Sequence, residues 1–238
     1  MTKTAQLGLP LVMPAQAQKH VTINEALARL DAAAQLRVVS SILETPPSMA
    51  TDGVSYLVPA DAVGEWLGRA GSIAVRCNGG WIFLDPKSGW RAWDGSTFGT
   101  LVFDGTGWIP DADAFSPGGA GTITRVLETD HTVVPGASSP TGVVIPAMAQ
   151  VLGLTGRVVD ALSGAGISSW RIGVTASDSR YGSGLGLALN SYLIGLSGNP
   201  VTYYSDTEIL ATAEGGEFSA GTIRLALHYM YLVPPRAV

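Results

Sequence analysis

The chain has 238 residues, a formal net charge of −5 and only 14% charged residues, against about 25% in an average globular protein. Lys and Arg form no cluster and no lysine follows Lys87, so the basic surface that nucleic-acid binding requires is missing. Cys77 is the single cysteine, which excludes an intramolecular disulfide and a Cys-rich metal site, and no apolar run reaches the roughly 18 residues that membrane insertion needs.

The N-terminal region predicts an arm followed by a helix. The first 15 residues contain Gly and Pro and predict an extended arm. A helix is expected over roughly residues 16–40, with Thr22 and Glu25 spaced as a capping box. Its apolar residues recur at helical spacing at Ile23, Leu27, Leu30 and Ala34. Because this stripe is narrow and rich in alanine, the helix either joins a bundle of helices or packs on the β-structure that follows.

Five of the six tryptophans lie between Trp66 and Trp108, beside Gly or Asp-Gly turns. This pattern is typical of tight β-hairpins. Short strands are expected at Val54 to Val58, Ile73 to Arg76, Trp81 to Leu84, Trp90 to Trp93 and Thr100 to Phe103. The rings either fill the core of this small Trp-rich module or form a platform that stacks sugars.

A linker is expected at residues 111–121, where Pro and Gly are frequent and apolar periodicity is absent. It separates an N-terminal domain, residues 1–110, from a C-terminal domain, residues 122–238. The C-terminal domain predicts eight short strands, typical of a jelly-roll-like β-sandwich, so the expected fold class is mainly β. The candidates are Thr132 to Val134, Val143 to Ile145, Arg157 to Leu162, Ser168 to Ala176, Leu185 to Leu189, Val201 to Tyr204, Ile209 to Ala213 and Thr222 to Val233.

Alternation along these strands predicts which side chains face the core. In the last strand Ile223, Leu225, Leu227, Tyr229, Tyr231 and Val233 share one face, and Arg224, His228 and Met230 lie opposite. Trp170 alternates with Ile172 and Val174 and is expected in the core. Second strand faces are often Ala, Gly or Leu rather than charged, which predicts a contact between copies of the chain.

The segment Leu7 to Leu27 (LGLPLVMPAQAQKHVTINEAL) carries a family resemblance. It resembles the opening of a family of uncharacterised domains encoded by alphaproteobacterial phages, prophages and gene transfer agents. That family continues through Pro46-Pro47, a Gly-x-x-Tyr strand (here Gly53 to Tyr56) and hairpins such as those around Trp81 and Trp90. The resemblance covers about residues 7–108.

This resemblance implies a virion fibre or spike subunit, on the tail or the head of a bacteriophage or gene transfer agent. The N-terminal arm and helix would contact other virion proteins, and the C-terminal β-domain would meet the host cell. Leu7 to Lys19 would then be a mature attachment segment rather than a signal peptide, in a chain made in the cytoplasm of the producing bacterium and located on the particle surface. The resemblance favours a homotrimer, with a pentamer as the alternative.

Carbohydrate binding is the positive hypothesis for the C-terminal domain. Aromatic faces cover the CH groups of sugars, while Asp, Asn and Arg side chains bond their hydroxyls. The expected binding residues, several of them in predicted loops, are Asp178, Arg180, Tyr181, Asn190, Tyr192, Tyr203 and Tyr204.

Catalysis is not expected, and no catalytic residue, metal or cofactor is assigned. No Gly-x-Ser-x-Gly elbow accompanies the histidines His20, His131 and His228, which also lack metal-type spacing. The run Tyr181 to Gly186 predicts a flexible turn rather than a nucleotide loop. A glycan-cleaving protein would draw its two carboxyl groups from Asp178, Asp206, Glu208, Glu214 and Glu217.

The sequence thus predicts a non-enzymatic virion fibre or spike subunit whose C-terminal domain recognises bacterial surface polysaccharide, with oligomeric avidity. The alternatives are a purely structural particle protein without a glycan site and a glycan-cleaving spike.

Overall fold

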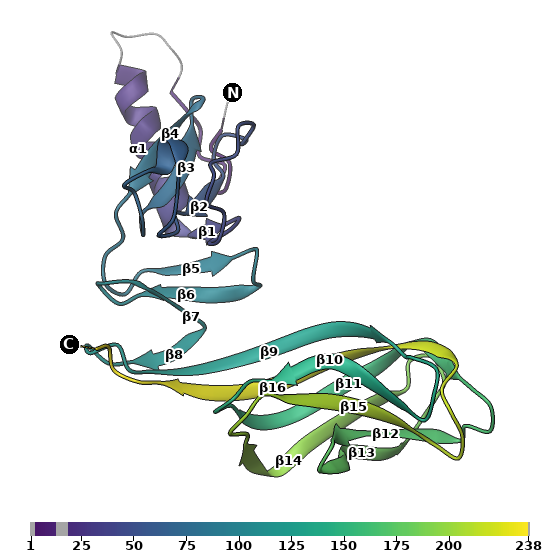
Figure 1. The fold of residues 1–238 in the computed structure, drawn as a ribbon. Helices are drawn as coiled ribbons and strands as arrows, with labels where there is room; N and C mark the ends of the chain where they lie inside the picture. The colour runs from purple at the N-terminus through teal and green to yellow at the C-terminus, as the bar shows by residue number, and fades with distance from the viewer. Residues whose placement is uncertain (1–2, 13–18, 238) are drawn as a thin grey trace. The chain divides into compact units, whose positions relative to one another are not determined.

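The computed structural model describes residues 3–12 and 19–237. This part of the chain is mainly β with one α-helix near the N-terminus, which confirms the predicted fold class. The chain divides into two compact units, Met1–Pro117 and Gly118–Val238 (Figure 1). Their boundary falls inside the stretch 111–121 that was predicted as a linker, and the same stretch holds the short strand β8 (Ala112–Phe115).

The first unit combines helix α1 (Lys19–Ala34) with two small sheets. One sheet has the order β2 (Ser55–Leu57), β3 (Ile73–Cys77), β4 (Gly80–Leu84), and a short 3₁₀ helix, Gly64–Trp66, lies between β2 and β3 in the chain. The other has the order β1 (Arg37–Val38), β5 (Arg91–Asp94), β6 (Gly99–Phe103), β7 (Trp108–Pro110). The five strands predicted for this region correspond to β2 to β6.

The helix differs from its prediction at both ends. Thr22 lies inside α1, so the predicted capping box is wrong, and residues 16–18 lie outside the described part of the chain. The helix ends at Ala34 rather than Ser40, because Leu36 and Val38 are buried in the core of the unit and Val38 belongs to β1.

Alanine, not the predicted stripe, attaches α1 to the sheets. Ala32 is 1% exposed and packs in a cluster with Val38 and Ile73. Ile23 lies nine residues from Ala32 and hence on the opposite side of a helix with 3.6 residues per turn. Ile23 and Leu30 accordingly remain 45% and 54% exposed. Of the two predicted alternatives, the helix therefore adopts packing on its own β-structure.

Within residues 3–12 the N-terminal arm is folded back rather than extended, contrary to the prediction; the rest of the predicted arm, residues 1–2 and 13–15, lies outside the described part of the chain. The amide of Thr4 donates to the carbonyl of Leu9 at 2.9 Å, which closes a loop. Asp31, 2% exposed on α1, accepts hydrogen bonds from Thr4 Oγ1 at 2.7 Å and from the amides of Gln6 at 2.9 Å and Leu7 at 2.6 Å. One buried carboxylate therefore holds the arm on the helix.

Acidification or the substitution Asp31→Asn is expected to release the arm. Burial raises the pKa of Asp31, but the hydrogen bonds from Leu7, Gln6 and Thr4 outweigh it and hold this pKa below its ordinary value of 3.8. The carboxylate therefore contributes its full stability above about pH 4, and the contribution is lost as the pH falls through the lowered value. Hydrogen bonds to a charged group contribute roughly 1.5–3 kcal/mol each.

Hydrogen exchange of the Gln6 and Leu7 amides measures this release. Protection should fall in Asp31→Asn at pH 7, and in the unsubstituted protein as the pH is lowered through the depressed pKa of Asp31, below its ordinary value of 3.8. Asp52→Asn is the matched control, because Asp52 also accepts two amides, those of Asn78 and Gly79, and neither of these donors belongs to the arm. Equal protection in the Asp31 and Asp52 variants would contradict the assignment.

Most tryptophans of the first unit belong to its core. Trp66 is fully buried, and its ring centroid lies 5.4 Å from that of Tyr56 and 5.2 Å from that of Trp81. Trp90 and Trp108 are partly buried against a second cluster, and Trp108 Nε1 donates to the carbonyl of Gly71 at 2.9 Å. Trp93 differs from them, since it is 41% exposed.

The second unit is a jelly roll. Among its described residues there are eight strands: β9 (Gly121–Thr132), β10 (Ser138–Ile145), β11 (Gln150–Ser163), β12 (Ser169–Val174), β13 (Ser177–Leu185), β14 (Tyr192–Thr202), β15 (Thr207–Glu214) and β16 (Ala220–Val233). They pair antiparallel in a nested way, β9 with β16, β10 with β15, β11 with β14 and β12 with β13. The resulting layers, β14-β11-β16-β9 and β10-β15-β12-β13, form the two-sheet arrangement of jelly rolls.

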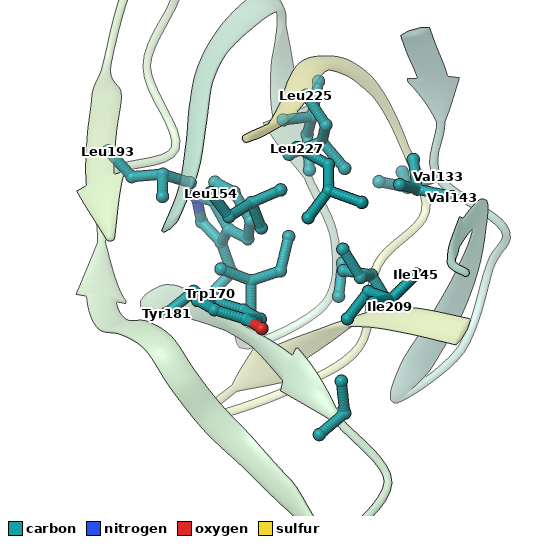
Figure 2. Close-up of a cluster of buried hydrophobic side chains, with 14 of the residues drawn as sticks. Val133, Val143, Ile145, Leu154, Trp170, Tyr181, Leu193, Ile209, Leu225 and Leu227 are labelled. Carbon is teal, nitrogen blue, oxygen red and sulfur yellow. The ribbon is translucent and has the colours of Figure 1, made fainter. Parts of the chain in front are cut away.

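The core of the second unit lies between these two layers. Leu154, Leu225 and Leu227 from one sheet face Trp170 and Ile209 from the other (Figure 2). All five are at most 1% exposed, which confirms the predicted core position of Trp170 and the predicted inward face of the last strand.

Four local predictions in this unit are wrong. The strand predicted at Thr132 to Val134 overlaps only the last residue of the much longer β9, and Leu185 to Leu189 lies mostly after β13. The loop expected at residues 177–181 and the turn expected at 181–186 are largely strand β13. Because β13 is the edge of its sheet, its polar and glycine residues stay accessible while its backbone pairs with β12.

Candidate functional site on the outer face of the jelly roll

Rows of side chains cross the solvent-facing side of the sheet β14-β11-β16-β9, here called the outer face. Along β14, positions 193 and 195, occupied by Leu193 and Gly195, face the core. The side chains of Tyr192, Ile194 and Leu196 face solvent and are 65%, 66% and 74% exposed. The strand register places residues in three rows: Tyr192, Arg157, Arg224, Asp130; Ile194, Thr155, Ala226, Glu128; and Leu196, Gly153, His228, Val126. The first row is aromatic and charged, and the third is largely apolar.

Two arginines give the first row a fixed geometry. The guanidinium carbon of Arg157 lies 5.7 Å from the centre of the Tyr192 ring, and its Nη1 donates to the carbonyl of Asn190 at 3.1 Å. Arg224 donates to both carboxylate oxygens of Asp130, at 2.6 Å and 2.7 Å. These hydrogen bonds lower the pKa of Asp130, so the pair is ionised at neutral pH.

A shallow groove of about 480 Å³ lies over the first two rows. Its lining includes Tyr192, Ile194, Arg157, Arg224, Thr155 and Glu128. The groove is deepest at the middle row, because β16 contributes only the small side chain of Ala226 there. The hydroxyl of Thr155 is hydrogen-bonded to Nε2 of His228 at 3.0 Å. The groove thus combines an accessible ring with guanidinium donors and a carboxylate acceptor, the combination that holds the CH face and hydroxyls of a sugar.

The seven residues predicted from the sequence fall into separate places. Asn190 and Tyr192 lie at the first row of the outer face. Asp178 and Arg180 lie on β13, in the other sheet, where Asp178 accepts from Arg171 at 2.7 Å. Tyr204 follows β14 and is 79% exposed.

Tyr181 and Tyr203 form a pair of their own. Tyr181 is 3% exposed and belongs to the core cluster (Figure 2). Its hydroxyl lies 2.9 Å from the hydroxyl of Tyr203. Burial, followed by this hydrogen bond, raises the pKa of Tyr181. Its ring face has no room for a sugar, so Tyr181 leaves the set of candidate binding residues.

Four polar or charged groove residues were not among the sequence candidates: Thr155, Arg157, Arg224 and Glu128. The alternation of the last strand had placed Arg224 opposite the core, which was a usable signal. Arg157 is assigned to the site only by the pairing of β11 with β14, between Arg157 and Tyr192. No local sequence pattern specifies that long-range register.

A histidine and a serine also form a hydrogen bond in the second unit. His131 Nε2 lies 2.7 Å from Ser139 Oγ, but the two residues are 8% and 0% exposed. The same Oγ accepts the amide of Val134 at 2.8 Å, and burial lowers the pKa of His131. This pair is inaccessible to a substrate and stabilises the connection after β9.

The carboxylates considered for glycan cleavage serve local structure. Asp206 accepts the amide of Ala147 at 2.8 Å, and Glu208 that of Gly142 at 3.3 Å. Glu214 accepts hydrogen bonds from the Ser169 hydroxyl and, at 2.9 Å, from the amide of Gly184. Its carboxylate also lies 3.7 Å from the Arg171 guanidinium. The Ser169 hydrogen bond leads the lowering of its pKa, whereas a general acid needs a raised one.

Within residues 3–12 and 19–237, no group of three or more His, Cys, Asp or Glu side chains is arranged to hold a metal ion. No helix in the described part of the chain is both long and apolar enough to cross a bilayer.

Comparison with known proteins matches the first unit to a family. Residues 23–109, less than half of the chain, match the family described as "Protein of unknown function (DUF2793)". No curated protein matches the chain.

Two solved structures share a remote likeness. One is "Cyanophage Pam1 capsid asymmetric unit", with 19% identity and a TM-score of 0.39, covering 47% of this chain and 86% of that chain. The other is "Acidic stable capsid structure of Helicobacter pylori bacteriophage KHP30", with 14% identity and a TM-score of 0.34, covering 48% of this chain and 98% of that chain. Likenesses this remote transfer no function.

Proposed function

We propose that the chain is a non-enzymatic surface subunit of a phage or gene-transfer-agent particle, and that its jelly roll binds bacterial surface polysaccharide at the outer face. The observation that carries the proposal is the Tyr192 ring, 65% exposed at the edge of a groove that also holds Arg157 and Arg224. The particle assignment rests on the family resemblance of the N-terminal segment.

The first row suits a hydroxyl-rich sugar. Arg157 is held between the Tyr192 ring and the Asn190 carbonyl, so little side-chain freedom is lost when it donates to a ligand. Arg224 is neutralised by Asp130, which leaves hydrogen-bonding capacity without a large net charge. A neutral polysaccharide laid along the groove would stack on Tyr192 and bond to these groups and to Glu128.

The remaining features of the proposal concern assembly. The arm and α1 would contact other virion proteins, and the subunit would form a closed homo-oligomer, a trimer in the first instance. Several weak glycan sites on one oligomer would then bind together with higher avidity.

A purely structural role is the second candidate, and the apolar side of the outer face favours it. Ile194, Leu196 and Val126 are 66%, 74% and 56% exposed. Clustered exposed aliphatic side chains are typical of protein contacts. In that case the outer face would be covered by a neighbouring subunit and no glycan would reach Tyr192.

The test measures binding, mass and polymer length on the purified full chain. Isothermal titration against surface polysaccharides extracted from bacterial cells, together with neutral dextran and mannan, should give saturable binding to at least one polymer. Light scattering should show an oligomer, and the polymer should keep its length. Absence of binding by a folded oligomer would overturn the glycan proposal in favour of the structural role, and a shortened polymer would overturn the non-enzymatic assignment.

A further inference from the structure

A second groove lies in the first unit, on the sheet β1-β5-β6-β7. In β5, Ala92 and Asp94 are buried at 3% and 0% exposure, whereas Arg91 and Trp93 are exposed. The register pairs Trp93 with Arg37 of β1 on one side and with Thr100 of β6 on the other. Arg37, Trp93 and Thr100 therefore stand side by side on one face, with Arg91 two residues along β5.

Trp93 is exposed where the other tryptophans are not. All six tryptophans belong to the described residues, and only Trp93 is more than a third exposed. Phe98, 82% exposed, meets it edge-on at 6.4 Å between ring centroids. Phe98 also has a φ of +52°, a left-handed conformation that costs a bulky residue on the order of 1–3 kcal/mol. The hairpin thus keeps a strained conformation that displays a ring to solvent.

The hairpin that carries these rings is rigid. Asp94, fully buried, accepts hydrogen bonds from the hydroxyl of Ser41, from the amide of Ser96 at 2.9 Å and from the hydroxyl of Ser96 at 2.7 Å. The amide of Gly95 donates to the carbonyl of Val38 at 2.9 Å. A side chain on such a support is held in place before any ligand arrives, which reduces the entropy lost on binding.

Positive charge dominates the groove. Its volume is about 570 Å³, and its lining contains Arg37 and Arg91 but no carboxylate. Among residues 3–12 and 19–237, no ion pair joins either arginine to an acid. The C-terminal end of α1 also borders the groove and carries roughly half a negative charge. Two full guanidinium charges outweigh it, in a chain whose net charge is −5.

We propose that this groove binds an acidic saccharide of the uronic-acid class. The sugar ring stacks on Trp93 through its CH face, and its carboxylate accepts hydrogen bonds from Arg91 in the bidentate geometry that guanidinium groups favour, while Arg37 adds a second positive charge beside it. This site is independent of the proposed neutral-glycan site, because it is built entirely from residues of the first unit. An acidic peptide would satisfy the arginines but would present no sugar face to Trp93.

The test uses the full chain and three probes: oligogalacturonate, neutral dextran oligomers and poly-L-glutamate of matched charge. Oligogalacturonate should bind at least tenfold more tightly than either of the others. Trp93→Ala and Arg91→Ala should each weaken it at least tenfold, and Trp93→Phe should restore most of the binding. Lys87→Ala is the matched control, because it removes one exposed positive charge of the same unit outside the groove and should leave the affinity unchanged.

Two results would overturn the inference. Equal affinity for poly-L-glutamate and oligogalacturonate would assign the groove to an acidic peptide, and unchanged binding in Trp93→Ala would reduce it to unspecific charge attraction. Tyr192→Ala separates the two sites. Loss of uronate binding in Tyr192→Ala, with binding kept in Trp93→Ala, would refute this site and assign uronate binding to the jelly roll, whereas loss in Trp93→Ala with binding kept in Tyr192→Ala supports it.

Discussion

Trp66→Ala is expected to destabilise the first compact unit strongly. The side chain is fully buried between Tyr56 and Trp81, with ring centroids 5.4 Å and 5.2 Å away. Truncating a buried tryptophan to alanine costs about 3–5 kcal/mol, from lost burial and the cavity left behind. Native domains are stable by only about 5–15 kcal/mol. The change therefore removes a large part of the stability of this unit.

Calorimetry and near-ultraviolet circular dichroism of the full chain measure this effect. Trp93→Ala is the matched control, because its ring is 41% exposed and should cost about 1 kcal/mol or less. Trp66→Phe should retain most of the stability, since Trp66 Nε1 is buried and has no hydrogen-bond partner among the described residues. Equal destabilisation by Trp66→Ala and Trp93→Ala would show that the tryptophans do not form the core.

Tyr192→Ala is expected to weaken polysaccharide binding by the jelly roll at least tenfold, equivalent to about 1.4 kcal/mol. The substitution removes the exposed ring and also the partner that orients the Arg157 guanidinium, 5.7 Å from the ring centre. Tyr192→Phe keeps both and should stay within about threefold of the unsubstituted protein. Stability should change little, because the Tyr192 side chain points into solvent from an edge strand.

Tyr204→Ala is the control for this prediction. Tyr204 is 79% exposed in the segment between β14 and β15, outside the groove. Its loss removes a surface tyrosine of the same unit and should not change the affinity. The opposite pattern, with binding lost in Tyr204→Ala and kept in Tyr192→Ala, would place the glycan at another end of the jelly roll.

Sequence periodicity predicted elements better than it predicted the site. The twelve residues from Thr222 to Val233 alternate so strictly that Leu225 and Leu227 could be assigned to the core and Arg224 to the opposite face. The structure confirms both assignments. The core position of Trp170 was predicted from the same kind of alternation and is also confirmed.

The site itself depends on distant pairings. Tyr192 and Arg157 are separated by a whole β12–β13 hairpin, and they meet because β14 pairs antiparallel with β11. A shift of that register by one residue would turn Tyr192 toward the core and Leu193 outward. Composition alone does not specify such a register.

Edge strands explain the incorrect predictions. The Gly- and Ser-rich run around Tyr181 suggested a loop, yet an edge strand needs apolar side chains on only one face. Tyr181 supplies that contact by packing into the core, which is why a residue chosen for a sugar platform is buried. The folded arm was unpredictable for a related reason, because its partner Asp31 lies more than 20 residues away on α1.

The most direct test of the glycan site observes the tyrosine rings of the full chain by nuclear magnetic resonance, with tyrosine selectively labelled and oligosaccharide fragments of a binding polymer added. The chain has seven tyrosines, and Tyr192→Phe assigns the relevant signal. The Tyr192 ring signal should shift in a saturable way while that of buried Tyr181 stays in place. A ligand that binds with the same affinity and leaves the Tyr192 signal unchanged would contradict the outer-face site.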